Sequence, residues 1–273
     1  AFGLMNADPS LLPDSPMFPD RAFFYRLADA AKAETLPRFR TGLDVVNKQE
    51  RGFDPVTEGD RAAEAAIRRL IVDHFPDDGI LGEEHDDIGL DRDHIWVIDP
   101  IDGTRAFISG VPVWGTLIGL QDKGRSVMGL MDQPFTGERY FADGTASWYA
   151  GPDGERQIHT RDCGTLSNAI MFTTSPHMFV GDDINRYRVI EDRVRLFRYG
   201  IDCYAYALLA AGHIDLVIET GLKPYDVGAL IPIVEQAGGI FTNWEGGRPE
   251  AGGRVIAAGS AAVHREALDL LAG

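Results

Sequence analysis

The feature that most constrains this chain is a short apolar stretch that ends in a turn with two aspartates. Residues 95–98 (Ile-Trp-Val-Ile) have the composition of a buried strand, and Asp-Pro-Ile-Asp-Gly-Thr follows at once, from Asp99 to Thr104. Pro100 disfavours helix at Asp99 and offers a sheet no N–H, while Gly103 allows a tight turn. The pattern predicts that Asp99 and Asp102 lie on a strand-ending turn, where both carboxylates can aim at one point.

Two carboxylates held this close repel each other unless a cation lies between them, and hard divalent cations such as Mg²⁺ prefer oxygen ligands. Gly103 and Thr104 stand where a short helix could begin, and its free N–H groups would suit a phosphate. Asp, Pro and Gly are also ordinary turn residues, so an exposed surface turn explains this stretch equally well on its own. An EF-hand loop fits less well, because Ile101 occupies the place of an oxygen ligand.

Composition limits the class of protein. The chain of 273 residues is 44% hydrophobic and 25% charged, as expected for a globular protein with one large domain or two intimate halves. Its net charge of −16 argues against general binding to nucleic acid or anionic membranes. An anionic substrate would therefore need a local positive charge, which bound metal ions would supply.

The remaining compositional signals exclude several alternatives. The chain has only 2 cysteines and no Cys/His cluster, which gives no support for a zinc site or a disulfide framework and suits a reducing cytoplasm. No apolar run approaches the roughly 20 residues of a membrane span, and no signal peptide is evident. The sequence contains no HExxH motif, nucleophile elbow, P-loop or dinucleotide fingerprint.

Hydrophobic periodicity predicts a mixed α+β and α/β chain in two halves. In the first half, residues 18–152, we expect helices over 19–38 and 58–74 and strands over 80–84, 95–98, 114–121, 126–132, 139–142 and 147–150. In the second half, residues 153–273, we expect strands over 169–173, 214–219 and 255–258 and helices over 183–197, 204–211, 226–237 and 261–271. Residues 1–17 are predicted to be a disordered tail or a non-native leader. This order favours helices covering sheets, in α/β/α/β/α layers.

Three further acidic positions accompany the central turn. Glu83 ends a predicted strand about a dozen residues before residue 95, so it can meet Asp99 if the two strands share a sheet; it could equally be a solvated strand end. Asp60 suits a capping box with Thr57, and a helix start could also turn it towards the acids. Asp226 stands at the start of a helix, where it meets the helix dipole or a metal.

The ordered combination of these motifs resembles the inositol monophosphatase superfamily from about Phe18 to the C-terminus. It consists of Asp54 to Asp60, Glu83-Glu84, Asp99 to Thr104, and Tyr225-Asp226 ahead of residues 232–239. The chain is most similar to the histidinol-phosphatase branch in residues 198–206 and 222–226, where Tyr225 replaces the usual Trp of inositol phosphatases. The resemblance implies a five-layered αβαβα sandwich, commonly a homodimer.

The resemblance also implies roles for individual residues. One Mg²⁺ would be bound by Glu83, Asp99 and the carbonyl of Ile101. A second would be bound by Asp99, Asp102 and Asp226, and Glu83 would also help to hold a third. Thr104 and Asp60 would orient the attacking water, with Glu83 also in the catalytic set, and the N–H groups of Gly103 and Thr104 would contact phosphate. The segment between Lys48 and Asp54 is longer than is typical, which leaves a phosphate role for Lys48 open.

These expectations describe a Mg²⁺-dependent hydrolase of a small phosphate monoester. The best substrate prediction is L-histidinol phosphate, cleaved to L-histidinol in cytoplasmic histidine biosynthesis. Asp202 and Glu219 are candidates to contact its cationic groups, although Asp202 could instead be a helix N-cap. The alternatives are an inositol-1-monophosphatase, a nucleotide-directed relative, which ranks lower, and, from another class, a phosphatase-like module that acts by binding a protein.

Overall fold

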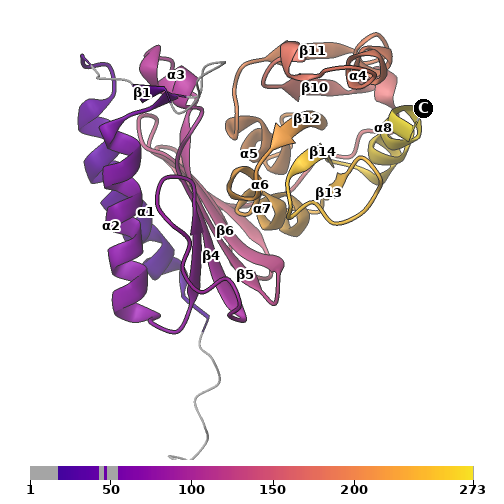
Figure 1. Ribbon diagram of the computed structural model, residues 1–273. Coiled ribbons are helices and arrows are strands. Elements are labelled where there is room, and N and C mark those ends of the chain that lie inside the picture. The colour runs from indigo at the N-terminus through magenta and orange to yellow at the C-terminus, as the bar shows by residue number, and fades with distance from the viewer. Residues whose placement is uncertain (1–17, 43–45, 48–54, 273) are drawn as a thin grey trace, which may run out of the picture.

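The computed structural model describes residues 18–42, 46–47 and 55–272. The first half opens with two helices, α1 (Arg21–Thr35) and α2 (Glu58–His74), which lie side by side and cover one face of a sheet (Figure 1). The predicted capping box begins α2: Thr57 Oγ1 accepts from the Gly59 N–H at 3.1 Å, and the Asp60 carboxylate accepts from the Thr57 N–H at 2.8 Å. The two helices bury Phe24, Leu27 and Ile67 against the sheet.

The first sheet has the strand order β3-β4-β5-β6-β7-β8-β9. Its strands are β3 (Gly79–Gly82), β4 (His94–Asp102), β5 (Gly115–Asp122), β6 (Arg125–Gln133), β7 (Glu138–Ala142), β8 (Ser147–Gly151) and β9 (Gly154–Ile158). Only β3 and β4 are parallel; the other neighbours are antiparallel. The sequence Asp-Lys-Gly-Arg over 122–125, between two predicted strands, is typical of a hairpin connection, and it does join β5 and β6. The chain turns at Lys123 and Gly124, which both have the positive φ that such a tight turn requires.

Three short helices separate this sheet from the second one. They are α5 (Tyr204–Ala210), α6 (Pro224–Val227) and α7 (Leu230–Gln236). The second sheet has the order β11-β10-β12-β14-β13 and consists of β10 (Ile170–Thr173), β11 (Leu196–Tyr199), β12 (Leu216–Leu222), β13 (Ile240–Asn243) and β14 (Gly253–Ala258). On its outer face lie α4 (Asp183–Glu191) and α8 (Ala261–Ala272). The predicted five-layered αβαβα sandwich is confirmed, with an apolar core in each of the interfaces between layers.

The remaining elements are small. A two-stranded pair joins β1 (Val46–Asn47) and β2 (Pro55–Val56), and α3 (Thr104–Ile108) follows β4. Three 3₁₀ turns complete the described structure: η2 (Leu36–Arg38), η3 (Leu166–Asn168) and η4 (Pro176–Met178). The predictions for residues 1–17 and for Lys48 with its 48–54 segment lie outside the described residues.

Several predicted boundaries were wrong. The helix expected over 183–197 ends at Glu191, and β11 begins at Leu196; all four residues of this edge strand are exposed, so no alternating burial pattern marks it. The helix expected over 226–237 is two helices, separated where Gly228 packs closely on Val97. Strands β9 and β13 were not predicted. The division expected between 152 and 153 falls inside the β8–β9 hairpin, and the passage to the second sheet comes after Ile158.

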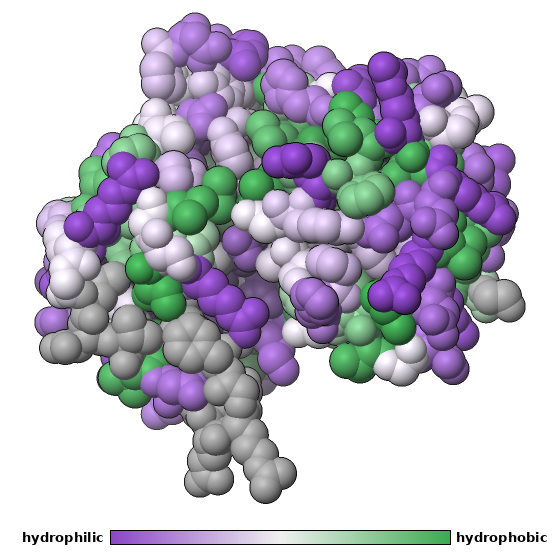
Figure 2. Space-filling model, turned by 90° about the horizontal axis from the view of Figure 1, so that it is seen from above, coloured by the Kyte–Doolittle hydropathy of each residue, from purple (hydrophilic) through white to green (hydrophobic). Residues whose placement is uncertain are grey.

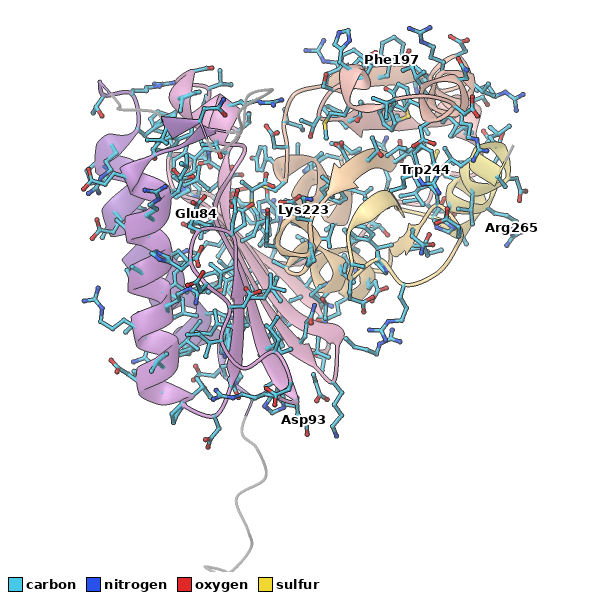
Figure 3. All side chains as sticks on the ribbon, viewed as in Figure 1. Glu84, Asp93, Phe197, Lys223, Trp244 and Arg265 are labelled. Atoms are coloured by element: carbon cyan, nitrogen blue, oxygen red, sulfur yellow. The ribbon has the colours of Figure 1, made fainter. Side chains whose placement is uncertain are left out.

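The exterior carries charged and apolar residues in mixture. Seen from above, hydrophobic residues form small separate groups among hydrophilic ones (Figure 2). Among the described helices, none combines the length and apolar character needed to cross a membrane. Two polar residues near the strand ends are marked in Figure 3: Glu84 lies between α2 and the first sheet, and Lys223 lies beside α6.

Candidate active site

The two aspartates of the central motif lie on β4 itself. We predicted that this strand ends before Asp99, but it continues to Asp102 and includes Pro100. Asp99 pairs with Leu117 and Asp102 with Gly115, so three steps along β4 face two along β5. This is a β-bulge, the place where a strand tolerates proline. In a regular strand, residues three apart point to opposite faces, and the extra residue brings both carboxylates to one side.

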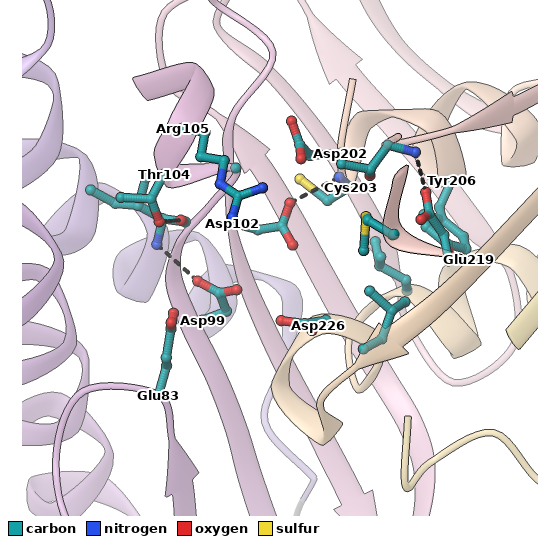
Figure 4. A pocket seen from close by; sticks show the side chains of 16 residues that line it. Glu83, Asp99, Asp102, Thr104, Arg105, Asp202, Cys203, Tyr206, Glu219 and Asp226 are labelled. Atoms are coloured by element: carbon teal, nitrogen blue, oxygen red, sulfur yellow. Dashed lines mark hydrogen bonds between the residues drawn. The ribbon is translucent and has the colours of Figure 1, made fainter. Parts of the chain in front are cut away.

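A third carboxylate reaches these two from the other half of the chain. One oxygen each from Asp99, Asp102 and Asp226 lie within 4.8 Å of one another. Asp226 sits in the first turn of α6, and its Oδ2 accepts a 2.7 Å hydrogen bond from the Lys223 N–H. Asp102 accepts a 2.9 Å hydrogen bond from the Cys203 N–H, and Asp99 one of 3.1 Å from the Ile101 N–H (Figure 4). Both halves therefore build the cluster.

Glu83 completes the group of acids at the edge of β3. The condition set by the sequence holds, because β3 and β4 are parallel neighbours and the last residue of β3, Gly82, pairs with Ile98, directly before Asp99. The Glu83 N–H donates to the Ile98 carbonyl at 3.2 Å, and the side chain points towards Asp99 (Figure 4). Glu83 and the three aspartates thus face one space.

That space is a cavity of about 250 Å³ between the first sheet and the middle helices. Its lining includes most of the residues predicted for the site together with several that were not. They are Glu83, Asp99, Ile101, Asp102, Gly103, Thr104, Arg105, Thr174, Met178, Asp202, Cys203, Tyr206, Glu219, Leu222, Asp226 and Leu230.

Burial of so many acids makes their ionisation unfavourable. Desolvation raises the pKa of Asp99 and of Asp102 well above the ordinary value. The negative charge of Glu83 raises the pKa of Asp99 further, and that of Asp202 raises the pKa of Asp102 further. Desolvation also raises the pKa of Asp226 to about 7. A divalent cation would reverse these shifts because it favours the ionised form. An all-oxygen donor set of this kind matches the chemistry of a hard cation such as Mg²⁺.

Gly103 links the aspartates to α3. Its φ is +82°, and a Cβ there would lie 3.2 Å from Asp202 Cγ, so both the backbone and the space require glycine. Thr104 is the first residue of α3, and its hydroxyl donates to the Ile101 carbonyl at 3.1 Å.

Asp60 approaches the acids from the opposite side, at the N-terminus of α2. It is fully buried, and desolvation raises its pKa to about 7, with contributions from the charges of Glu84 and Glu83. Its Oδ2 accepts from Thr57, whereas its Oδ1 has no hydrogen-bond partner within the described part of the chain. It does not line the cavity directly. The orphaned oxygen leaves one acceptor available beside the acids.

The two residues predicted to contact substrate also line the cavity. Glu219, on β12, is buried and accepts from the Thr174 N–H at 2.6 Å and the Thr173 hydroxyl at 3.2 Å; desolvation raises its pKa to about 8. Asp202 has a φ of 42°, which is rare for a residue other than glycine. The alternative of an N-cap for Asp202 is wrong, because α5 begins at Tyr204 with Cys203 as its N-cap.

Sequence reasoning missed seven lining residues, which are Arg105, Thr174, Met178, Cys203, Tyr206, Leu222 and Leu230. Arg105 follows the central motif directly and is a positive charge on this acidic cavity; its charge lowers the pKa of Asp202, which burial raises to about 6. Cys203 and Tyr206 lie on the buried side, in the same 198–206 segment that carries the family resemblance. Position within a recognised segment was the available signal for them.

Comparison with known proteins gives a consistent result. The model of the inositol monophosphatase family matches residues 19–272. Bifunctional phosphatase IMPL2, chloroplastic, of Arabidopsis thaliana is 42% identical over 280 residues, which cover 98% of this chain and 79% of the relative. A histidinol-phosphatase of Chlorobaculum parvum is 36% identical over 84% of this chain and 88% of its own. The solved structure of an inositol monophosphatase from Zymomonas mobilis, 41% identical, superposes with a TM-score of 0.82 and covers 92% of this chain and 97% of that one.

Proposed function

Since this chain belongs to the inositol monophosphatase family and is a phosphatase of that family, we propose that it is a Mg²⁺-dependent phosphomonoesterase that hydrolyses L-histidinol phosphate. The observation that carries the proposal is the convergence of Asp99, Asp102 and Asp226 within 4.8 Å, with Glu83 on the same cavity. The residues present fit Mg²⁺ because every donor is an oxygen, and we propose that two or three ions bind.

We assign the metal ligands as the family resemblance implies. One ion would be held by Glu83, Asp99 and the Ile101 carbonyl. A second would be held by Asp99, Asp102 and Asp226, and Glu83 would also contribute to a third. When bound, Mg²⁺ neutralises phosphate charge and lowers the pKa of a coordinated water. The bulge in β4 is what allows Asp99 and Asp102 to act on the same ions.

Other residues of the chain orient the reactants. Thr104 and Asp60 are proposed to position the attacking water, with the free Oδ1 of Asp60 as the acceptor. The N–H groups of Gly103 and Thr104 stand at the start of α3, where they are proposed to hold the phosphate. The leaving alcohol then lies on the side of the cavity formed by the second half.

That side of the cavity supports a cationic leaving group. Asp202 and Glu219 are two carboxylates outside the proposed metal cluster, and among the described residues that line the cavity only Arg105 is positive. Histidinol carries an ammonium and an imidazole, both of which suit carboxylate partners. The Chlorobaculum relative, a histidinol-phosphatase, agrees with this preference.

An inositol phosphate is the second candidate. The polar Glu219 could accept from a ring hydroxyl, and the similar Zymomonas structure is an inositol monophosphatase. A phosphatase-like binding module is the third, but a module of that kind needs no buried acids at a cavity.

Phosphate release with Mg²⁺ tests the proposal, with histidinol phosphate and inositol 1-phosphate compared at equal concentrations. We expect a large preference for histidinol phosphate in kcat/KM. A preference for the inositol ester would keep the metal site and overturn the substrate assignment. Release from neither ester, in protein that binds Mg²⁺, would favour the binding module.

We also propose a homodimer that works in a reducing compartment such as the cytoplasm. The edge strand β11 exposes Leu196, Phe197 and Tyr199, which is apolar surface suited to a second copy. Cys163 and Cys203 are both free thiols. Light scattering of the purified chain measures the oligomer, and Phe197→Asp is expected to shift it to monomer.

A further inference from the structure

Helix α2 carries a buried ion pair that the proposed chemistry does not use. Glu64 is fully buried and Arg68, one turn later, is 9% exposed; Arg68 Nε donates to Glu64 Oε1 at 2.6 Å. Charged side chains are almost never buried to this degree unless their hydrogen bonds are satisfied. What the pair contacts therefore indicates why it is there.

The pair binds the backbone of the segment directly after Glu83. Glu64 Oε2 accepts from the Glu84 N–H at 2.7 Å, and Oε1 accepts from the His85 N–H at 3.2 Å. Arg68 Nη1 donates to the Asp86 carbonyl at 2.9 Å, and Nη2 donates to the His85 carbonyl at 3.1 Å. Four backbone groups of residues 84–86 are thus held by two side chains of one helix.

The residue before Glu83 is Gly82, and its lack of a side chain leaves room for the Glu64–Arg68 pair. A Cβ at Gly82 would lie 2.1 Å from Glu64 Oε1 and 2.6 Å from Arg68 Nη2, so any side chain there would displace the ends of this pair. On its other side, the Glu83 N–H is bound to the Ile98 carbonyl of β4. The backbone at Glu83 is therefore held by β4, the segment directly after it is held by α2, and the Glu83 side chain points towards Asp99 (Figure 4).

The same face of α2 also presents Asp60. Asp60, Glu64 and Arg68 recur every four residues, so they form one buried polar stripe along the helix. The first meets the acidic cluster and the other two hold the segment after Glu83. A buried ion pair is weak as a source of stability, since apolar residues of similar size often do as well. Apolar side chains could not bind the four backbone groups, however.

We propose that Glu64 and Arg68 are positioning residues, which hold the backbone of residues 84–86 on α2 and so place the Glu83 carboxylate at the metal cluster in fixed relation to Asp60. The inference rests on the proposed function, because it takes Glu83 as a Mg²⁺ ligand. Partners of this kind, which orient a ligand without touching the metal, typically change metal affinity or activity by about 10- to 100-fold when lost.

Mg²⁺ titration by calorimetry, without substrate, tests the proposal on the full chain. Glu64→Gln is expected to bind Mg²⁺ about tenfold more weakly, with kcat largely restored at saturating Mg²⁺. Asp132→Asn is the matched control, because Asp132 is also a buried carboxylate paired with an arginine, Arg139 at 2.7 Å, and it does not line the cavity. That control should lower the melting temperature and leave Mg²⁺ affinity unchanged. Wild-type affinity in Glu64→Gln, or an equal loss in the control, would overturn the inference.

A measurement in EDTA separates this inference from the proposed function. Hydrogen exchange at the Glu84 and His85 amides should be at least about tenfold faster in Glu64→Gln than in wild type, because their acceptor is weakened. Unchanged exchange would refute the positioning role even if the phosphatase assignment holds. If wild type binds Mg²⁺ but cleaves neither ester, the substrate proposal fails and this one stands. If Glu64→Gln does not fold, Arg68→Lys serves as the test variant, because it keeps the positive charge but loses the forked contact to the backbone of residues 85 and 86. Arg68→Lys is expected to weaken Mg²⁺ binding several-fold. Wild-type Mg²⁺ affinity in this variant would refute the positioning role.

Discussion

The backbone N–H of Cys203 donates a 2.9 Å hydrogen bond to the carboxylate of Asp102, across 101 residues of sequence. Asp102 belongs to β4 of the first half and Cys203 to the start of α5 in the second. The contact ties the metal cluster to the segment that carries Asp202. The proposed metal ligands and the residue proposed to contact substrate are therefore parts of one structural unit, and we expect changes at either to be felt at the other.

Replacement of Asp99 by Asn should nearly abolish turnover and leave the fold intact. Metal ions contribute several kcal/mol of transition-state stabilisation, so we expect kcat/KM to fall by about a thousandfold. In EDTA the variant should melt at a higher temperature than wild type, because a charge disfavoured by burial has been removed. The exposed Asp269→Asn serves as control and should behave as wild type in both assays. Normal turnover in Asp99→Asn would refute the metal assignment.

Stability of the metal-free protein should fall as pH rises from 5 to 8. Burial raises the pKa of Asp60 and Asp226 to about 7 in the folded protein, so between the ordinary value of 3.8 and 7 the folded state binds more protons than the unfolded state. Its free energy of unfolding therefore decreases as pH rises through that window. Thermal unfolding in EDTA measures this as a melting temperature several degrees lower at pH 8 than at pH 5.

Addition of Mg²⁺ at pH 8 should restore the lost stability, because the ion binds the folded state alone. Asp226→Asn should show a weaker pH dependence than wild type, as one of the shifted groups is gone. A melting temperature in EDTA that rises from pH 5 to pH 8 would contradict the assignment of uncompensated buried acids.

Gly103→Ala should cost both stability and activity. The left-handed φ of +82° costs roughly 1–2 kcal/mol for a residue with a Cβ, and the added atom would press on Asp202 at 3.2 Å. Gly124→Ala is a close control: its φ is +75°, but nothing lies within 4 Å of the added Cβ. Both variants should lose similar stability in chemical denaturation, and only Gly103→Ala should lose kcat/KM. Equal activity in the two would show that the Asp202 contact is irrelevant to the site.

Asp202→Asn should discriminate between the candidate substrates. Asparagine also tolerates a left-handed backbone, so the φ of 42° is kept and only the charge is lost. A hydrogen bond to a charged group is worth about 1.5–3 kcal/mol, which corresponds to a fall of roughly 10- to 100-fold in kcat/KM for histidinol phosphate. Inositol 1-phosphate, which has no cation, should be affected much less. An equal fall for both esters would assign Asp202 to the metal cluster rather than to the leaving group.

Local sequence patterns were sufficient to predict those features of the fold that depend only on residues close together in sequence. The capping box of Thr57 and Asp60 needs only adjacent residues, so the start of α2 was predicted to the residue. The two-residue turn at Lys123 and Gly124 was likewise visible. The αβαβα layering followed from alternating periodicities together with the family resemblance.

Hydrophobic periodicity did not predict strands whose residues show no alternation of buried and exposed side chains. Strand β11 is exposed along its whole length, so its residues show no alternation, and its first two residues, Leu196 and Phe197, were predicted to end a helix. The extension of β4 through Pro100 was also hidden, because proline normally argues against a strand and the bulge that admits it depends on β5.

The acids of the site could be chosen from local sequence patterns, but only the family resemblance implied that they converge. No local pattern shows that carboxylate oxygens of Asp226 and Asp99 come within 4.8 Å of each other, because more than a hundred residues separate them in sequence. Nor does any local pattern show that Asp202 packs against Gly103, nearly a hundred residues away. Tertiary packing decided them: the bulge turned Asp102 to the side of Asp99, and the middle helices brought Asp226 and Cys203 against it. Residue chemistry indicated the candidate ligands of this protein, and the packing of two sheets on a shared helical layer brought them together at one cavity.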